Sequence, residues 1–278
     1  VATTLNNLAI LQSGTSRHKE AEACYAEALE IRRKLAEANP DAYNPDLAMT
    51  LYNLAILQSD TGRLKEAEAC YAEALEIRRN LAEANPDAYN PDVAMTLYNL
   101  AILQSDTGRL KEAEASYAEA LEIYRKLAKA NPDAYNPDVA MTLNNLALLL
   151  SDTGRLKEAE ACYADALEIR RNLADANPDV YLPDVAMTLN NLANLQSDTN
   201  CLNEAEANCT EALGIYLELE LTNPIIYLST VIRILKFLVK IKEKLSKTED
   251  IEELMKMLVE TERAIEILSE AQTPENKS

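Results

Sequence analysis

The side chains that most often perform acid–base or metal chemistry are sparse in this sequence. Its 278 residues include one histidine, His18, so no second imidazole is available for a histidine-based metal site or a proton relay. Glycine-rich phosphate-binding loops are also excluded, because there are only 5 glycines, about 2 % of the chain against a usual share of roughly 7 %. We predict that the protein is not an enzyme, that it holds no cofactor and no metal, and that His18 is an exposed residue on the first turn of a helix.

The five cysteines form no Cys-x-x-Cys pair. Three of them, Cys24, Cys70 and Cys162, occupy one position of the 46-residue repeat described below. Packed helices stand about 8–10 Å apart, whereas a disulfide needs Cα atoms within about 7 Å, so we expect small buried apolar side chains rather than bridges or metal ligands. The odd number of cysteines, with Cys201 and Cys209, is typical of a reduced intracellular chain, and we predict a cytoplasmic location.

Paired glutamates are the remaining candidates for acid–base catalysis. They recur with Lys and Arg at helical spacing, which is typical of a solvated helix face with ion pairs. One repeat carries Glu66, Glu68, Glu73 and Glu76 with Lys65, Arg78 and Arg79. We interpret this set as the outer surface of the protein and not as a catalytic site.

The net charge of −19, from 27 basic and 46 acidic residues, repels nucleic acid and anionic membranes at long range. We therefore predict no nucleic-acid or membrane partner, and a protein or peptide ligand that is neutral to basic or apolar. Because 48 % of the residues are apolar and Ala, Leu, Glu, Lys and Arg predominate, the composition indicates a helical protein with a buried core.

A repeat of 46 residues organises the chain. The segments 47–92 and 93–138 are identical at 41 of 46 positions. Such near-identity indicates units that pack in the same way. The leucines that mark the repeat are Leu5, Leu51, Leu97, Leu143 and Leu189.

Each repeat is predicted to form two helices, A and B. Asn44-Pro45-Asp46 combines an N-cap, a first-turn proline and an acidic residue, so helix A is expected to begin near Pro45. Gly62 supplies the left-handed position at its end, as Gly108 and Gly154 do later in the chain. Asn200 replaces this glycine in the fifth repeat, and in the first Ser16 stands in its place, where we expect a looser turn.

Helix B is expected from Arg63 to Ala84, because Asn85-Pro86 disfavours its continuation. Residues 85–90 would then form a proline-bounded connector. We expect Tyr89, like its equivalents Tyr43 and Tyr135, to pack this connector onto the array.

The repeated pattern resembles the tetratricopeptide family. With Leu51 counted as position 4, the repeat reads L-x₂-L-A-x₂-Q … A-x₃-Y-x₂-A, with small residues at Ala55, Ala67 and Ala74 and an aromatic at Tyr71. Residues 91–101 and 183–193 look like the long-repeat variety typified by the kinesin light chain. The resemblance implies an all-α, right-handed superhelical solenoid of antiparallel helix pairs, which binds proteins or peptides in a concave groove lined by the A helices.

We divide the chain into five repeats, a degenerate sixth helix pair and a tail. The basic stretch 233–247 lies in the sixth pair, which we interpret as a polar cap for solubility or as a patch for an acidic partner. The five repeats are residues 1–46, 47–92, 93–138, 139–184 and 185–224, the cap is 225–271, and the disordered tail is 272–278.

The family resemblance places the groove at positions 2, 5, 9 and 12 of helix A. In the five repeats these positions are apolar or carry amides and hydroxyls, without the Lys and Arg with which carboxylate-clamp members hold acidic tails. For the asparagine at position 6 of every repeat, an intramolecular ladder is an equal alternative to ligand binding. The predicted groove residues are Asn6, Met49, Tyr52, Ile56, Met95, Tyr98, Ile102, Met141, Asn144, Leu148, Met187, Asn190 and Asn194.

These observations predict a non-enzymatic scaffold that binds a peptide or protein segment in the groove of the A helices. The alternative is a structural array that self-associates by stacking through its exposed ends.

Overall fold

The computed structural model describes residues 1–272, with side chains to residue 268, and within these residues the chain forms twelve α-helices and no strand. The helices fall into two compact units, Val1–Tyr135 and the residues from Asn136 onward. The predicted all-α fold of consecutive helix pairs is confirmed. The right-handed superhelical course of the whole chain stays a prediction.

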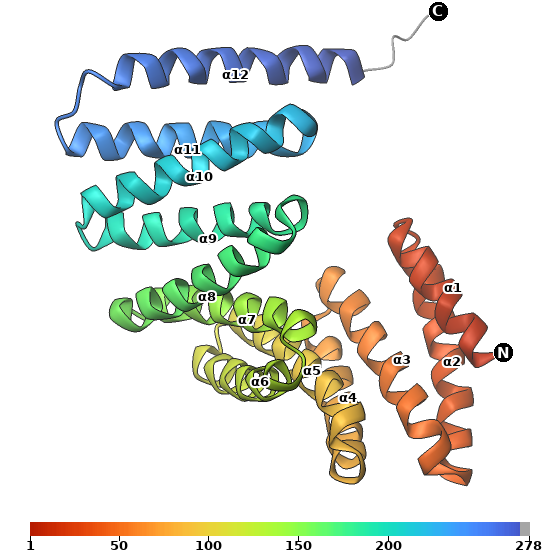
Figure 1. Cartoon of the computed structure of the whole chain (residues 1–278). Coiled ribbons are helices and arrows are strands. Elements are labelled where there is room, and N and C mark those ends of the chain that lie inside the picture. Colours follow the sequence, from red (N-terminus) through yellow and green to blue (C-terminus); the bar gives the residue numbers. More distant parts are fainter. Residues whose placement is uncertain (273–278) are drawn as a thin grey trace, which may run out of the picture. The chain divides into compact units, whose positions relative to one another are not determined.

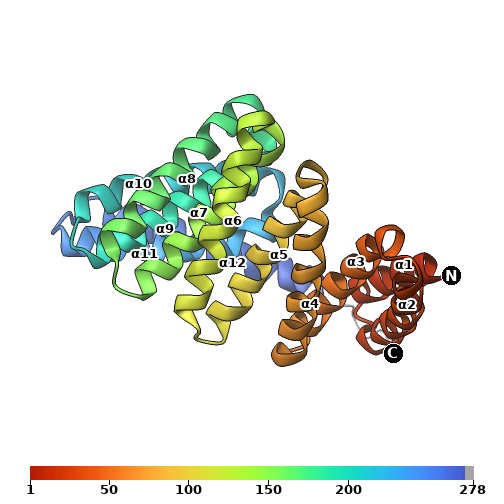
Figure 2. The ribbon, with the colours of Figure 1, turned by 90° about the horizontal axis from the view of Figure 1, so that it is seen from below.

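In the first unit each helix from α1 to α6 packs against the next one in the chain. Figure 2 shows α3, α4 and α5 as successive neighbours. The helices are α1 (Ala2–Gly14), α2 (His18–Ala38), α3 (Pro40–Asp60), α4 (Leu64–Ala84), α5 (Pro86–Asp106) and α6 (Leu110–Ala130), and α7 spans Pro132–Asp152.

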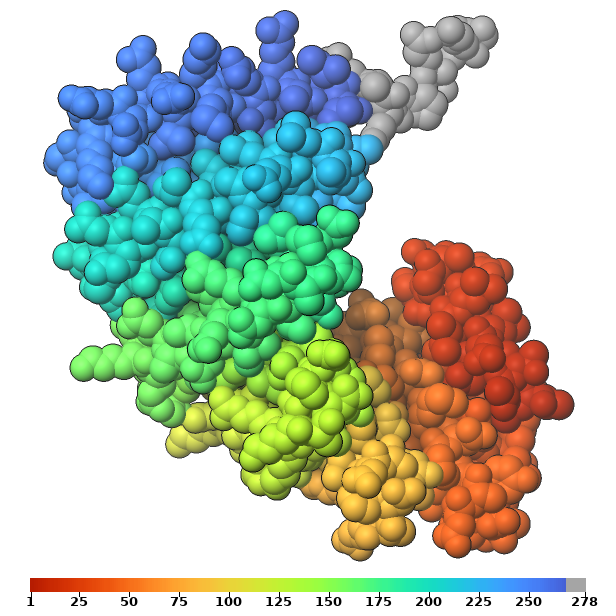
Figure 3. All heavy atoms as spheres, in the orientation of Figure 1, coloured from red at the N-terminus to blue at the C-terminus, as the bar shows by residue number. Residues whose placement is uncertain are grey.

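The second unit contains most of α7 and five further helices, which Figure 1 shows stacked in chain order from α8 to α12. Figure 3 shows their side chains, coloured green to blue, filling the space between successive helices. The helices are α8 (Leu156–Ala176), α9 (Pro178–Asp198), α10 (Leu202–Thr222), α11 (Pro224–Lys244) and α12 (Ile251–Gln272). The predicted tail beyond Gln272 lies outside the described residues.

The A helices begin five residues earlier than predicted. Helix α3 starts at Pro40, where the Asn39 side chain accepts a hydrogen bond from the Ala42 amide at 3.4 Å, and it runs on through Pro45. Each of the first three repeats ends in two Asn-Pro-Asp triplets five residues apart, and the first triplet of each pair caps the next A helix. The connector expected at residues 85–90 is therefore a single residue, Asn85, followed by the start of α5, and Tyr89 lies half-buried on the first turn of that helix.

The turn from helix A to helix B has a left-handed residue at the same position in all five repeats. Gly62 has φ +77°, and the prediction of a left-handed residue at this position is confirmed, including its equivalents Ser16 at 59° and Asn200 at 63°. The turn at Ser16, where we expected a looser turn, differs in one bond: the Thr15 amide donates to the Gln12 carbonyl, whereas the equivalent Thr61 amide donates to the Leu57 carbonyl. The bond from the Arg17 amide to the Gln12 carbonyl is 2.8 Å, identical to that between Arg63 and Gln58.

Small residues allow the two helices of each pair to approach closely, as the pattern predicted. Ala55, Ala67 and Ala74 are completely buried, and Tyr71 fills the space between them. The sixth pair, α11 and α12, packs on α10 through larger residues such as Leu235 and Ile241.

The cysteines differ in part from the prediction. Cys24, Cys70 and Cys162 are half-buried and not fully buried, because one side of each side chain reaches the surface of its B helix. None of the chain's cysteines, all of which lie in the described residues, forms a disulfide.

Candidate interaction surface

Positions 2 and 9 of the A helices present apolar side chains to solvent, as predicted for the groove. Met49 on α3 is 36 % exposed and Leu148 on α7 is 51 % exposed. Met187 on α9 is also exposed. The other apolar members of this set are half-buried: Ile56, Met95, Ile102 and Met141.

Most side chains at position 5, in contrast, are not available to a ligand. Tyr52 and Tyr98, which we predicted to offer contacts near the middle of the groove, are each only 9 % exposed, and Asn6 and Asn144 are buried as well. Asn190 on α9 is the exception and is half-buried. The prediction that position 5 lines the groove therefore fails for these four residues.

The surroundings of Tyr52 explain its burial. Its ring meets the edge of Tyr71 with centroids 5.8 Å apart, and the guanidinium of Arg78 lies 4.6 Å from its centroid. Its hydroxyl accepts a hydrogen bond of 2.8 Å from the Asn99 side chain. Aromatic, cation–π and polar contacts thus occupy the whole side chain.

The asparagines at position 6 form links between neighbouring A helices. Asn53 donates to Asn6 at 3.4 Å, and Asn191 donates to Asn144 at 3.3 Å. Asn99 donates to Tyr52 in the same way. Of the two alternatives for these residues, the structure favours the intramolecular ladder, because position 6 of one repeat is hydrogen-bonded to position 5 of the repeat before it.

A buried arginine joins successive repeats, and the sequence interpretation missed it. Arg78 was predicted on the solvated outer face, but its side chain is buried and donates to Thr96 Oγ1 at 2.6 Å and to the Asp92 carbonyl at 3.1 Å. Burial lowers the pKa of the Arg78 guanidinium, and the nearby Asp92 carboxylate opposes that shift. Arg32 with Thr50 and Arg170 with Thr188 repeat the arrangement.

The sequence signal for this contact was the constant spacing of 18 residues between the arginine and its threonine. In the fifth B helix the same position holds Tyr216, and the matching threonine is replaced by Ile234. Both side chains lie in one apolar cluster, whereas in the third B helix Tyr124 takes the arginine position and the matching threonine, Thr142, is retained.

The rest of the acidic and basic set lies outside, as predicted, but its ion pairs mostly join different repeats. Arg33 contacts Glu73 and Arg79 contacts Glu119, each at 2.6 Å and each from one B helix to the next. Pairing within one turn also occurs, as between Glu30 and Lys34. Because these groups are substantially exposed, each pair contributes little to stability.

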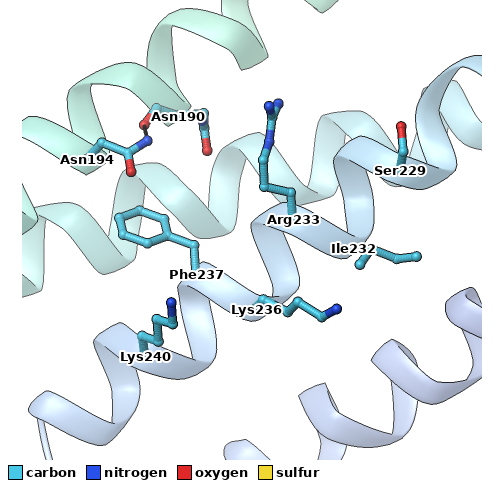
Figure 4. A pocket seen from close by; sticks show the side chains of 8 residues that line it. All are labelled: Asn190, Asn194, Ser229, Ile232, Arg233, Lys236, Phe237 and Lys240. Carbon is cyan, nitrogen blue, oxygen red and sulfur yellow. Dashed lines mark hydrogen bonds between the residues drawn. The ribbon is translucent and has the colours of Figure 1, made fainter.

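One hollow of about 470 Å³ opens between α9 and α11. Figure 4 shows Arg233 and Phe237 extending from α11 towards Asn190 and Asn194 of α9. The sequence analysis found no Lys or Arg in the groove of the five repeats, but Arg233 and Lys240 stand at positions 2 and 9 of the sixth pair. The complete lining is Asn190, Asn194, Ser229, Ile232, Arg233, Lys236, Phe237 and Lys240.

A charge network fastens the sixth pair to the fifth. Lys242 donates to Glu206 at 2.8 Å and to Asp250 at 2.6 Å, and Lys247 also donates to Glu206. Burial raises the pKa of Glu206, but the hydrogen bonds from the two lysines outweigh it, and the net pKa lies below the usual value. These cations hold the fold together and are not available for a ligand.

The remaining side chains of chemical interest in the described residues are a single histidine and the acidic groups. His18 is the first residue of α2 and is half-buried, not exposed as predicted, because its Nδ1 atom is shielded from solvent. No group of three or more His, Cys, Asp or Glu side chains in the described part of the chain is placed to hold a metal ion. A search of the same residues finds no helix with the length and apolar character needed to cross a membrane.

The 46-residue helix pairs and their exposed A-helix face define a helical repeat protein with a candidate interaction surface. Family models described as tetratricopeptide repeat match residues 1–80 and 79–126, and a second such model matches residues 139–179. Since these matches cover more than half of the sequence, the chain belongs to the tetratricopeptide repeat family. No curated protein matches the chain significantly in sequence.

Solved structures share the fold. BtubC (BKLC) from P. vanneervenii is 23 % identical with a TM-score of 0.71, over 90 % of this chain and 92 % of that one. The nearly identical TPR-like repeats of a putative kinesin light chain from Podosopora anserina are 16 % identical with a TM-score of 0.62, over 78 % and 96 %. The apo form of RapI is 15 % identical with a TM-score of 0.64, over 95 % and 98 %. The predicted likeness to kinesin-light-chain repeats is confirmed at the level of the fold.

Proposed function

We propose that this protein is a non-enzymatic scaffold that binds a protein or peptide segment along the A helices. The observation that carries the proposal is the set of accessible apolar side chains at positions 2 and 9 within each unit, such as Met49 in the first unit and Leu148 and Met187 in the second. Methionine is flexible and polarizable, so such a set adapts to ligands of varied shape. We propose a segment that is apolar or neutral to basic where it meets these side chains, and no nucleic acid or membrane. The cytoplasmic location stays a prediction.

The test replaces the methionines of this set and leaves the core intact. Peptides that bind the chain are first selected from a random displayed library, and their affinities are measured by calorimetry. The variant Met49→Gln, Met95→Gln, Met141→Gln and Met187→Gln should bind them at least about tenfold more weakly, because each change removes apolar contact area.

A control variant carries Met255→Gln and Val259→Gln, which alter exposed apolar residues of α12 outside the set. It should bind the selected peptides as the unchanged chain does. Equal affinity of the methionine variant and the unchanged chain for every selected peptide would contradict the proposed surface.

Self-association is a second candidate function, favoured by the exposed face of α1. Leu11 is 61 % exposed, whereas its equivalent Leu57 is 1 % exposed, and Leu8 is also more exposed than Leu54. A second copy of the chain that covered this face would bury the same kind of surface that repeats bury against each other. Sedimentation velocity over a concentration series should then show a dimer that weakens in the variant Leu8→Gln and Leu11→Gln. A monomer at all concentrations would exclude this function for the chain.

A further inference from the structure

The corner where α10 meets α11 is apolar, whereas the equivalent corners of the earlier repeats are charged. We propose that this corner binds the same corner of a second copy of the chain and forms a weak dimer with two-fold symmetry. We call it the apolar corner and define it by Val180, Leu221, Ile225 and Ile226. None of these residues belongs to the apolar set of the proposed function or to the exposed face of α1.

Three exposed positions around the junction asparagine change type at this corner. An acid or a lysine is replaced by Leu221, an aspartate by Ile225, and an alanine or valine by Ile226. The residues of the earlier repeats are Glu37, Glu83, Lys129 and Asp175 at the first position, Asp41, Asp87, Asp133 and Asp179 at the second, and Ala42, Ala88, Ala134 and Val180 at the third.

The aliphatic side chains of the corner remain in solvent. Leu221 is 87 % exposed and Ile225 is 65 % exposed, and Ile226 and Val180 are each more than half exposed. Val180 and Ile226 hold equivalent positions on the first turns of α9 and α11. Figure 1 shows the α8–α9 and α10–α11 junctions on the same side of the second unit. The four residues therefore lie along one edge of this unit.

The packing of the chain does not account for these side chains. Helices α3, α5, α7 and α9 each have an aspartate in the first turn, where the positive end of the helix dipole stabilises it, but α11 has no acidic residue there. Ile225 thus replaces a favourable charge and remains mostly exposed. Three neighbouring aliphatic residues of this kind indicate a surface that another molecule covers.

The charge of the chain decides at which corner two copies can meet. Each copy carries a net charge of −19, so copies repel each other, and contact between two earlier corners would bring together acids such as Glu83 and Asp87. At the apolar corner the acids of these positions are absent. A basic partner, in contrast, would be attracted to the earlier corners and not to this one.

The corner is also suited to contact with itself. A two-fold contact needs only one surface, because each patch meets its own copy. Asn223 lies between Leu221 and Ile225, is exposed, and makes no capping hydrogen bond to α11, whereas Asn39 accepts one from the first turn of α3. The amide of Asn223 can therefore both donate to and accept from the same amide across the axis.

The area of the corner predicts a weak dimer. Four side chains exposed to this extent present on the order of 400 Å² of apolar surface, and two copies with their polar rim would bury about 1,000 Å². This total is at the lower limit for a specific interface, so we expect a dissociation constant of about 10–100 µM.

Sedimentation equilibrium of the 278-residue chain, at concentrations up to about 0.5 mM, tests the proposal. The chain should dimerise, and its dissociation constant should decrease about threefold between about 0.05 M and 0.5 M NaCl, because salt screens the repulsion between two acidic copies. Weakening of the dimer by salt would indicate an ionic contact and overturn the proposal. A monomer at every concentration would also overturn it.

The corner variant Leu221→Asp and Ile225→Asp copies Asp175 and Asp179 of the preceding junction, so its urea midpoint should be no lower than that of the unchanged chain. It should weaken the dimer at least about tenfold, because it removes apolar contact area and adds charge. The matched control, Met255→Glu and Val259→Glu, also replaces two exposed apolar residues and adds the same charge. The control should dimerise as the unchanged chain does, and equal weakening in both variants would overturn the assignment to the corner.

A mixing experiment tests the two-fold symmetry. A labelled corner variant in an excess of unlabelled unchanged chain should sediment as a monomer, because both copies of a two-fold dimer need an intact corner. Capture of the variant would show that the corner binds a different surface of the chain and would overturn the proposal. A dimer that is weakened by Leu8→Gln and Leu11→Gln but not by the corner variant would assign self-association to α1 instead.

Discussion

The surface between α3 and α5 is closed at the position where the surface between α9 and α11 is open. In the first region Tyr52 fills position 5, with Arg78 over its ring and Asn99 on its hydroxyl. In the second region position 5 holds Asn190 and then Lys236, and a hollow remains. The backbone repeat is the same in both, so the difference comes from the side chains at a few positions.

A repeated surface of this kind has two roles: it stabilises the junction between repeats, and it offers exposed side chains to a ligand. Where position 5 is aromatic, it stabilises the junction of two repeats and has little area left for a ligand. At the junction of α10 and α11, where position 5 holds Asn190 and then Lys236, Tyr216 and Ile234 add apolar contacts in place of the arginine and threonine of other junctions. Position 5 alone does not decide the outcome, because Asn6 and Asn144 are short and yet buried.

The largest expected effect is the loss of the buried arginine. Arg78→Leu should destabilise the junction of α4 and α5 by about 3 kcal/mol, because it removes two hydrogen bonds from a cation and the contact with Tyr52. Urea unfolding followed by circular dichroism measures the change, and hydrogen exchange locates it to the junction.

The control for this variant introduces the two residues that form the junction of α10 and α11. The double variant Arg78→Tyr and Thr96→Ile copies Tyr216 and Ile234, and it should recover stability to within about 1 kcal/mol of the unchanged chain. If it is less stable than Arg78→Leu alone, the two junctions are not interchangeable solutions.

Replacing Tyr52 in the closed region should lower the free energy of unfolding by about 2 kcal/mol. Tyr52→Asn removes the ring contacts with Tyr71 and Arg78 and the acceptor of Asn99. The reverse change, Asn190→Tyr, should alter stability by no more than about 0.5 kcal/mol, because it adds a ring to a partly open site. Urea midpoints of the two variants provide the measurement, and equal losses would show that position 5 has the same role in both regions.

Acid should loosen the sixth pair selectively. The folded pKa of Glu206 is lowered, so its stabilising effect is complete above the unfolded carboxyl value of about 4.3 and is lost as the pH falls through the lower folded value. The Lys242 hydrogen bond lowers the pKa of Asp250 in the same direction. The stability that this network gives to the packing of α11 and α12 should therefore decrease as the pH falls below about 4.3, as urea titrations at each pH would show.

Glu206→Gln should weaken the same junction by about 1–2 kcal/mol at pH 7 and reduce its further loss in acid. Glu204→Gln, an exposed residue of the same helix, provides the control and should keep the acid step. An acid step of unchanged size in Glu206→Gln would assign it to other carboxyl groups.

The smallest expected effect is an increase in stability. The buried Gln58 Oε1 has no hydrogen-bond partner in the described structure, whereas the equivalent Gln104 Oε1 accepts from Ser116 at 2.8 Å. Cys70→Ser places a hydroxyl opposite Gln58 and should stabilise the chain by about 1 kcal/mol. Cys162→Ser is the matched control, because Leu150 stands in place of the glutamine there, and it should bring no gain in the urea midpoint.

The sequence was sufficient for features set by local chemistry. The period of 46, the left-handed residue at Gly62 and the small residues of the pair core follow from spacing and backbone sterics alone. The start of helix A did not follow, because two Asn-Pro-Asp triplets satisfy the same capping rules, and the helix begins at the first triplet and runs on through the proline of the second.

The candidate site was predictable only in part, because burial depends on the neighbouring repeat. Met49 and Leu148 are exposed as the family pattern implied, but Tyr52 is covered by an arginine that the charge pattern had placed outside. A buried guanidinium is not visible in a count of charges, since only its hydrogen bonds to Thr96 and Asp92 make burial tolerable. The cations of α11 and the register of this helix were available in the sequence, because Leu235 lies 46 residues after Leu189, but only the structure shows that Arg233 and Lys240 line a hollow.

The single residue between one B helix and the next A helix has a mechanical consequence. Asn85 ends α4 and begins α5, with φ −144° and ψ 81°, so no slack chain separates the helices on either side. A tension applied along the chain cannot be absorbed by straightening a linker. It must either rotate the two dihedral angles of one residue or unwind a helical turn, and the junction therefore transmits force as a stiff hinge.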